Sequence, residues 1–138
     1  MPQQEAVIRL LLVEDRLEDA EQLISHLRNG GIAVRPQRPE SEEDLVRLLA
    51  AQSIDLVVAA FEASYIPLAT VVERVSATGK DIPVLATTAT LDEKVALSAL
   101  KAGTRDVALR NHPEHVQAVV RSAWAESIRA SCRFKVNL

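Results

Sequence analysis

Two adjacent carboxylates, Glu14 and Asp15, follow directly after an apolar run of strand length at residues 8–13. Carboxylate oxygens are the ligands that a hard divalent cation such as Mg²⁺ prefers in proteins. Asp15 also precedes Glu18 by three residues, which is the capping-box spacing at the start of a helix. The sequence therefore leaves two roles open for Asp15, a metal ligand and a helix cap.

Strand and helix patterns alternate five times along the chain, with no linker between the units. Nearly continuous apolar runs, as strands buried on both faces require, predict central strands at 8–13, 54–60 and 82–88. Shorter mixed runs predict flanking strands at 32–36 and 106–110. Helical periodicity and helix stop signals predict helices at 17–29, from Ser41 onward, and at 68–77, 92–102 and 113–129.

Five such units joined by right-handed crossovers predict an α/β domain of the flavodoxin-like, doubly wound kind. This fold is a three-layer sandwich of five helices and five parallel strands in the order 2-1-3-4-5, and its ligands bind at the carboxyl ends of the strands. We expect one domain over residues 1–129, followed by a tail or truncated linker over 130–138.

The composition argues against several functional classes. A formal net charge of −3 and an aromatic content of 3% do not suit a general nucleic-acid-binding protein. The apolar runs are shorter than the roughly 20 residues of a membrane span, and the single Cys132 excludes an internal disulfide. The first residues lack the basic and apolar segments of a secretory signal, so we expect a cytoplasmic location.

Four strings across residues 7–129 resemble the receiver domain of response regulators, the CheY-like domain. They are VEDRLEDAEQL at 13–23, DLVVAA at 55–60, IPVLATTA at 82–89 and KAGTRDVALR at 101–110. In that family an acidic pair binds Mg²⁺, and an Asp that ends the third strand accepts a phosphoryl group. A Thr or Ser that ends the fourth strand and a Lys that ends the fifth contact the phosphate, and an aromatic residue in the fifth strand reports the switch.

The resemblance is incomplete at the positions that carry this chemistry. The acidic pair is present and Thr88 matches the hydroxyl residue, but Ala60, which has no nucleophile, stands at the acceptor position. Arg110 replaces the lysine, and Val107 replaces the aromatic switch residue. The resemblance therefore implies a degenerate receiver with a vestigial phosphate pocket and no catalytic residue.

Without the third carboxylate, Glu14 and Asp15 are expected to bind Mg²⁺ weakly at best, and no other cofactor is expected. A further hypothesis is that Arg110 folds onto this pair as a permanent stand-in for the metal. Glu62, two residues past Ala60, is interpreted as a solvated loop residue or a substitute metal ligand. A role for Glu62 as an alternative phosphoryl acceptor is the competing interpretation, and it would need close in-line placement.

The last helix carries the candidate interface, because its apolar stripe continues through Val120 and Trp124 to Ile128. A large ring at this place either packs on a second copy or a following domain, or closes the core of its own domain. We expect the contact surface on the fourth or fifth predicted helix, with Trp124 as its anchor. His112 and His115 have no third His or Cys nearby, so surface positions are expected for both.

Together these features predict a phosphorylation-independent pseudo-receiver, not an enzyme, that acts by protein–protein contact. The acidic end of the first strand, AA at the acceptor and ALR before the last helix resemble the amino-terminal degenerate receiver of FimX-type proteins, which carry GGDEF and EAL domains of cyclic-di-GMP signalling. This resemblance implies dimerisation, localisation or regulation of attached or partner domains, with no nucleic-acid or membrane partner.

Two alternatives stay open. The first is a two-component receiver that accepts phosphate in a phosphorelay at a non-standard acidic residue, such as Glu62 or Asp15. The second is a small-ligand or enzyme site on the same scaffold, since a fold alone does not fix a function.

Overall fold

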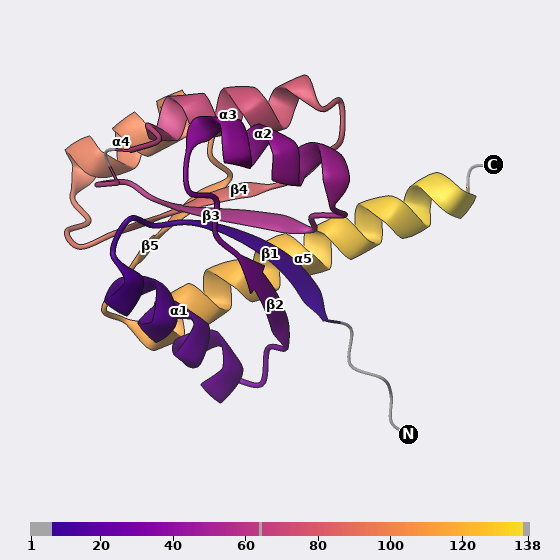
Figure 1. The fold of residues 1–138 in the computed structure, drawn as a ribbon. Helices are drawn as coiled ribbons and strands as arrows, with labels where there is room; N and C mark the ends of the chain where they lie inside the picture. The colour runs from indigo at the N-terminus through magenta and orange to yellow at the C-terminus, as the bar shows by residue number, and fades with distance from the viewer. Residues whose placement is uncertain (1–6, 64, 137–138) are drawn as a thin grey trace.

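The structure is a computed structural model that describes residues 7–63 and 65–136, with the side chains of the last helix described as far as Glu126. Strands and helices alternate from β1 to α5, and the five strands form one parallel sheet in the order β2-β1-β3-β4-β5 (Figure 1). Helices α1 and α5 cover one face of this sheet, and α2, α3 and α4 cover the other (Figure 1). The predicted flavodoxin-like three-layer fold is confirmed.

The strands follow the apolar runs of the sequence closely. They are β1 at Ile8–Val13, β2 at Val34–Gln37, β3 at Leu56–Ala60, β4 at Val84–Thr88 and β5 at Asp106–Leu109. Every residue of the central strands β3 and β4 is buried, as strands covered by helices on both faces must be. β2 begins two residues later than predicted, because the Ile32 amide donates to the Leu27 carbonyl at 2.9 Å and still belongs to the end of α1.

The helices are α1 at Leu17–Asn29, α2 at Glu42–Ala51, α3 at Leu68–Ala77, α4 at Glu93–Ala102 and α5 at Pro113–Val136. Ser41 caps α2 as predicted, since its hydroxyl accepts from the Asp44 amide at 3.1 Å. Of the two roles left open for Asp15, that of helix cap is not found. The residue at the cap position is Arg16, not Asp15, and no side chain caps this helix end.

The last helix continues to Val136, beyond the end predicted at residue 129, and Figure 1 shows its final turns projecting past the sheet. Residues 130–138 include no glycine or proline that would stop the helix. The boundary between a domain and a tail at 129/130 stays a prediction. The Ile128 side chain, proposed for the interface, lies outside the described side chains.

Gly103 fixes the passage from α4 into β5. Its φ of 105° is left-handed, a conformation that glycine adopts without strain. A Cβ at this position would lie 2.8 Å from Cγ1 of Val72 on α3. The glycine therefore permits both the turn and the close approach of α3 to the end of α4.

Candidate functional site

Polar side chains from four strand ends gather at one edge of the sheet. β1, β3, β4 and β5 are parallel neighbours, so their carboxyl ends lie side by side. The structure brings together at this edge the side chains of Glu14 after β1, Glu62 after β3, Thr88 at the end of β4 and Arg110 after β5. We call this group the strand-end cluster.

A tight turn places Glu62 in the cluster. The Ala63 amide donates to the Ala60 carbonyl at 3.1 Å, which turns the chain immediately after β3. The Phe61 amide donates to the Thr87 carbonyl at 2.7 Å and holds this turn against β4. The turn therefore carries the Glu62 side chain across to the end of β4.

The Glu62 carboxylate is bonded on both oxygens. Its Oε2 accepts from the Thr88 hydroxyl at 2.6 Å and from the Ala89 amide at 3.0 Å. Its Oε1 accepts from Nη1 of Arg110 at 3.2 Å. Glu62 lies on a turn and its side chain is 44% exposed, as the interpretation as a solvated loop residue expects, but that interpretation is incomplete because the carboxylate also has three protein donors.

Arg110 is the cation at the centre of the cluster. Its backbone amide donates to the Thr88 carbonyl at 2.8 Å, and its side chain is only 14% exposed. The guanidinium lies 3.7 Å from Glu14 Oε1 and 3.9 Å from Asp19 Oδ2, in addition to its bond with Glu62. The expected fold-back onto an acidic pair is thus found for Glu14, with Asp19 and Glu62 in place of Asp15.

Glu14 is buried and Asp15 is exposed, so the two adjacent carboxylates differ in environment. Burial is the main cause that raises the pKa of Glu14, and it is partly opposed by the Arg16 amide and the Arg110 charge. The Arg16 amide donates to Glu14 Oε2 at 3.2 Å. Nη2 of Arg38 donates to the Glu14 backbone carbonyl at 2.6 Å and fixes the end of β1.

The pKa of Glu62 shifts the other way. Partial burial alone would raise it, but the hydrogen bonds from Thr88 and Ala89 and the charge of Arg110 outweigh burial and lower the pKa below its usual value. Glu62 is therefore an ionised carboxylate at neutral pH.

The two positions that resemble a receiver's acceptor and switch hold aliphatic side chains. Ala60 is 2% exposed at the end of β3 and offers only a methyl group. Val107 is buried in the core between the sheet and α2, α3 and α4. Thr88 lies 2.9 Å from the Thr90 carbonyl and accepts from the Thr90 amide at 3.3 Å, so its hydroxyl has local partners besides Glu62.

The cluster does not fit the Mg²⁺ ion that the family resemblance implies. The Arg110 guanidinium already stands beside Glu14, and Ala60 cannot supply a third carboxylate. Within the described residues, no group of three or more His, Cys, Asp and Glu side chains could hold a metal ion. A cation would have to displace Arg110 to reach Glu14.

The residues proposed for the interface lie partly in the core. Val120 is buried at 2% exposure against the sheet, and its assignment to an interface is wrong because it faces the domain's own core. Trp124 is partly buried and packs against the same core.

His115 accepts from the Leu109 amide at 3.2 Å through Nδ1, and His112 is exposed.

The sequence analysis expected a contact surface on the fourth or fifth helix but named no residue on α4 for it. Leu97 and Leu100 are 51% and 53% exposed, although their residue type belongs in a core. Leu100 also lines a groove of about 430 Å³ with Leu91, Ala96, Val107 and others. The signal was in the sequence, since both leucines lie outside the stripe that buries Ala99.

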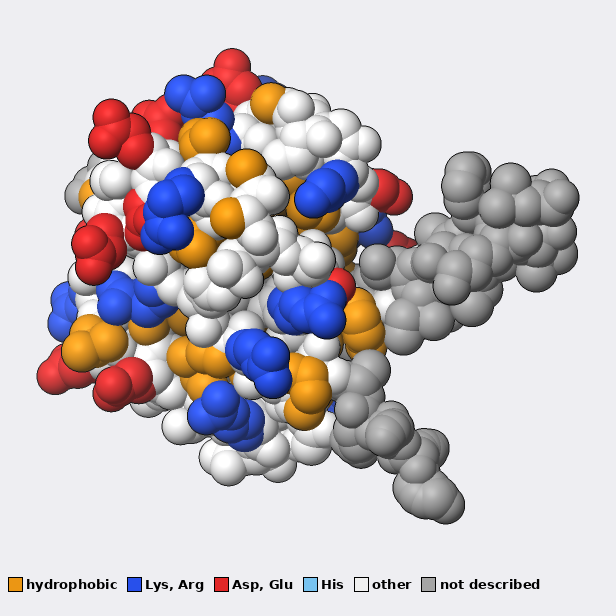
Figure 2. Space-filling view, turned by 45° about the vertical axis from the view of Figure 1, so that its right-hand side comes forward, with side chains coloured by type: hydrophobic (Ala, Val, Ile, Leu, Met, Phe, Trp, Pro, Cys, Tyr) orange, Lys and Arg blue, Asp and Glu red, His pale blue; other side chains and the backbone are white. Residues whose placement is uncertain are grey.

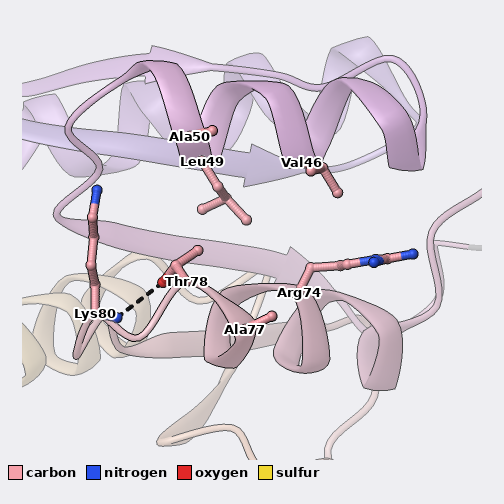
Figure 3. A pocket seen from close by; sticks show the side chains of 7 residues that line it. All are labelled: Val46, Leu49, Ala50, Arg74, Ala77, Thr78 and Lys80. Carbon is pink, nitrogen blue, oxygen red and sulfur yellow. Dashed lines mark hydrogen bonds between the residues drawn. The ribbon is translucent and has the colours of Figure 1, made fainter.

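A second groove, of about 370 Å³, lies between α2 and α3 (Figure 3). Leu49, Val46 and Ala77 give it apolar walls, and Arg74 and Lys80 lie at its ends (Figure 3). Nε of Arg74 donates to Glu42 at 2.8 Å, so this guanidinium is already paired. The groove is separate from the strand-end cluster and contains no carboxylate, hydroxyl pair or histidine suited to catalysis.

The charged side chains on the face in Figure 2 alternate with apolar and uncharged ones. Lys and Arg side chains on this face form several separate groups, with acidic side chains mainly toward one edge (Figure 2). No helix in the described part of the chain is both long and apolar enough to cross a membrane.

The comparisons with known proteins agree with the geometry of the sheet. No family model and no curated protein matches this chain. It is similar to a solved protein from Chloroflexus aurantiacus named as a response regulator, with 26% identity and a TM-score of 0.73 over 88% of this chain and 99% of that one.

Two further solved structures show the same similarity. The signal receiver domain of a Luxo repressor protein from Vibrio parahaemolyticus has 14% identity and a TM-score of 0.76, over 92% of this chain and 97% of its own. Full-length FixJ from B. japonicum has 19% identity and a TM-score of 0.73, over 89% of this chain and 60% of its own. The chain therefore has the fold of response-regulator receiver domains.

Proposed function

We propose that this chain is a receiver-like signalling module that works without phosphorylation and acts by contact with other proteins. The observation that carries the proposal is the state of the strand-end cluster. Ala60 supplies no acceptor oxygen, and the donors Thr88, Ala89 and Arg110 already bind the carboxylate of Glu62. Phosphoryl transfer needs both a nucleophile and free donors that stabilise the charge of the transferred group.

The proposed partners are proteins: a second copy, or output domains that are attached or separate. FixJ supports this reading, because the similarity covers only 60% of that full-length chain and the receiver fold there is part of a longer protein. The resemblance to FimX-type receivers makes domains of cyclic-di-GMP turnover the specific expectation. We propose that such a module works in the cytoplasm.

The exposed leucines of α4 support a contact surface on this helix. Leu97 and Leu100 are large apolar side chains that lie more than half in solvent, next to the groove beside β5. Apolar groups of this kind gain free energy when a partner covers them. Trp124 stays a proposed anchor on α5, although part of its ring is already used in the domain's own core.

The test of phosphate independence is an amide NMR titration with Mg²⁺, followed by beryllofluoride as a phosphoryl mimic. We expect no saturable shifts at Glu14, Ala60 and Thr88. Saturable shifts that spread to Arg110 and α4 would contradict the proposal and favour a receiver that accepts phosphate at a non-standard acidic residue. Mass spectrometry after treatment with acetyl phosphate separates the two functions, because only a receiver that accepts phosphate at a non-standard residue predicts a labelled Glu62 or Asp15.

The contact surface is tested by sedimentation of variants that remove exposed apolar groups. Leu100→Ser is expected to weaken self-association, and Leu17→Ser is the matched control, since Leu17 is 56% exposed on α1 at the opposite face of the sheet. Equal sedimentation of Leu100→Ser, Trp124→Ala and the wild type would contradict self-association through α4 or α5. Binding to attached or separate output domains would then be the form of contact to measure.

A further inference from the structure

Three donors from two parts of the chain converge on one carboxylate. The Thr88 hydroxyl and the Ala89 amide, at the end of β4, lie 2.6 and 3.0 Å from Glu62 Oε2. Nη1 of Arg110, after β5, lies 3.2 Å from Glu62 Oε1. A hydroxyl, a backbone amide and a guanidinium arranged around two oxygens are the donors that recognise small oxyanions.

The donors are more firmly fixed than the carboxylate they bind. Thr88 is fully buried, and Arg110 is held by its backbone bond to Thr88 and by the nearby carboxylates of Glu14 and Asp19. Glu62 lies on a turn, and its side chain is 44% exposed. The donors are therefore held by the sheet and its neighbours, whereas the carboxylate reaches them from an exposed turn.

We propose that Glu62 is a tethered ligand of an oxyanion site formed by Thr88, Ala89 and Arg110, and that this site binds a free oxyanion only when the carboxylate is removed. A ligand on a short flexible tether competes at an effective concentration in the millimolar range or above. Free phosphate or acetate at lower concentrations is therefore excluded from the site. Glu62 thus holds the strand ends in a filled state without any external ligand.

This inference deepens the proposed function and rests on it, because a pocket filled by the chain itself has no need of a phosphoryl group. What is new is the role of Glu62 as the group that fills this pocket. The site is predicted to select carboxylate and phosphate groups, which share the negative oxygens that the three donors require.

The experiment compares the wild type with Glu62→Ala and Glu62→Gln by amide NMR. The alanine variant empties the site, and the glutamine variant keeps the volume and one acceptor oxygen but removes the charge. Glu73→Gln is the matched control, since Glu73 is an exposed glutamate on α3 with no hydrogen bond to its side chain among those of the described residues. Each protein is titrated with inorganic phosphate and, separately, with acetate, at constant ionic strength.

We expect the Ala89 amide resonance to shift in both Glu62 variants and its hydrogen exchange to become about tenfold faster in Glu62→Ala. Phosphate and acetate should then produce saturable shifts at Ala89 and Thr88 in Glu62→Ala, at least about tenfold tighter than in the wild type. Glu73→Gln should titrate like the wild type.

Two results would overturn the inference. One is an Ala89 resonance and exchange rate that do not change when Glu62 is replaced. The other is an equal response of the wild type and Glu62→Ala to the two anions, including no response in either. Labelling of another residue by acetyl phosphate would contradict the proposed function and leave these Ala89 measurements as they are, so the two failures are distinguishable.

Discussion

The hydroxyl of Thr88 lies 2.6 Å from the carboxylate of Glu62, which joins two strand ends that are 26 positions apart in the sequence. Thr88 is fully buried, so its hydroxyl needs a partner within the protein. Glu62 supplies one such partner from a turn at the surface, in addition to the backbone of Thr90. The carboxyl edge of the sheet is thereby held in one hydrogen-bonded arrangement that uses only groups of this chain.

The first prediction concerns Arg110. Arg110→Ala should lower the free energy of unfolding by about 2 kcal/mol, because it leaves the buried Glu14 carboxylate and the Glu62 carboxylate without their common cation. Urea unfolding measures the loss, and amide shifts around Glu14 report the local change. Arg35→Ala is the control on an exposed strand position and should cost less than about 0.5 kcal/mol. Unchanged stability and unchanged shifts around Glu14 would refute the stand-in role of Arg110.

The second prediction is a pH dependence that belongs to Glu62. Its pKa is lowered in the folded protein from the ordinary value of 4.5, so its contribution to stability is present above that value and is lost as the pH falls through the folded pKa. Glu62→Gln should therefore be less stable than the wild type by about 1 kcal/mol at neutral pH. The difference should shrink as the pH falls below about 4.5.

Glu14 also contributes to the pH dependence of stability, so the effect of Glu62 has to be measured as the difference between the wild type and Glu62→Gln. Its raised pKa acts with the opposite sign, because the folded state takes up a proton first and gains stability as the pH falls toward the ordinary value of 4.5. This contribution is common to the wild type and Glu62→Gln and largely cancels in their difference. Urea unfolding of both proteins at a series of pH values measures this difference in stability. A difference that stays constant down to about pH 3 would argue against an ionised, hydrogen-bonded Glu62.

The sequence predicts the elements of this fold well where one pattern dominates. β1 at Ile8–Val13 and α3 at Leu68–Ala77 have the predicted bounds, because apolar runs and helical periodicity end there at clear changes of residue type. The end of α5 is not predictable in the same way, since residues 130–138 include no glycine or proline. Local patterns cannot locate an end that no local signal marks.

The candidate site, like the fold, could be predicted from the sequence only in part. That Glu14, Thr88 and Arg110 lie at one edge follows from the parallel order of the strands, which brings their carboxyl ends together. The direction of the Glu62 side chain depends on the turn closed by the Ala63 amide, and a turn has no periodicity from which a direction can be read. The role of Glu62 therefore emerges only with the three-dimensional contacts.

The third prediction tests the close passage of α4 past α3. Gly103→Ala should lower stability by about 2 kcal/mol, because a side chain is strained at a φ of 105° and its Cβ would lie 2.8 Å from Val72. Gly31→Ala is the matched control, since Gly31 has a φ of 82° but no atom within 4 Å of the added Cβ. Gly31→Ala should lower the free energy of unfolding by only about 1 kcal/mol. Thermal unfolding of both variants checks that Gly103→Ala loses more stability than Gly31→Ala. Equal losses of stability would show that the contact with Val72 is unimportant.

The fourth prediction restores a carboxylate at the acceptor position. Ala60 is 2% exposed beside Glu14 and Glu62, so Ala60→Asp buries another negative group and should lower stability by about 2 kcal/mol in the absence of metal. The third carboxylate completes an oxygen donor set, and Mg²⁺ at about 10 mM should then raise the melting temperature of this variant, since a ligand of the native state stabilises it.

Ala60→Asn controls for the volume and polarity of the new side chain without its charge. It should be destabilised to a smaller extent and should not respond to Mg²⁺, and the wild type should not respond either. The comparison separates the two reasons why the natural chain lacks a fitting metal site: the missing carboxylate at Ala60 and the guanidinium of Arg110 beside Glu14. If Ala60→Asp shows no response to Mg²⁺ while Ala60→Asp with Arg110→Ala does, Arg110 is the group that excludes the cation. A melting temperature of the wild type that rises with Mg²⁺ as much as that of Ala60→Asp would contradict both reasons.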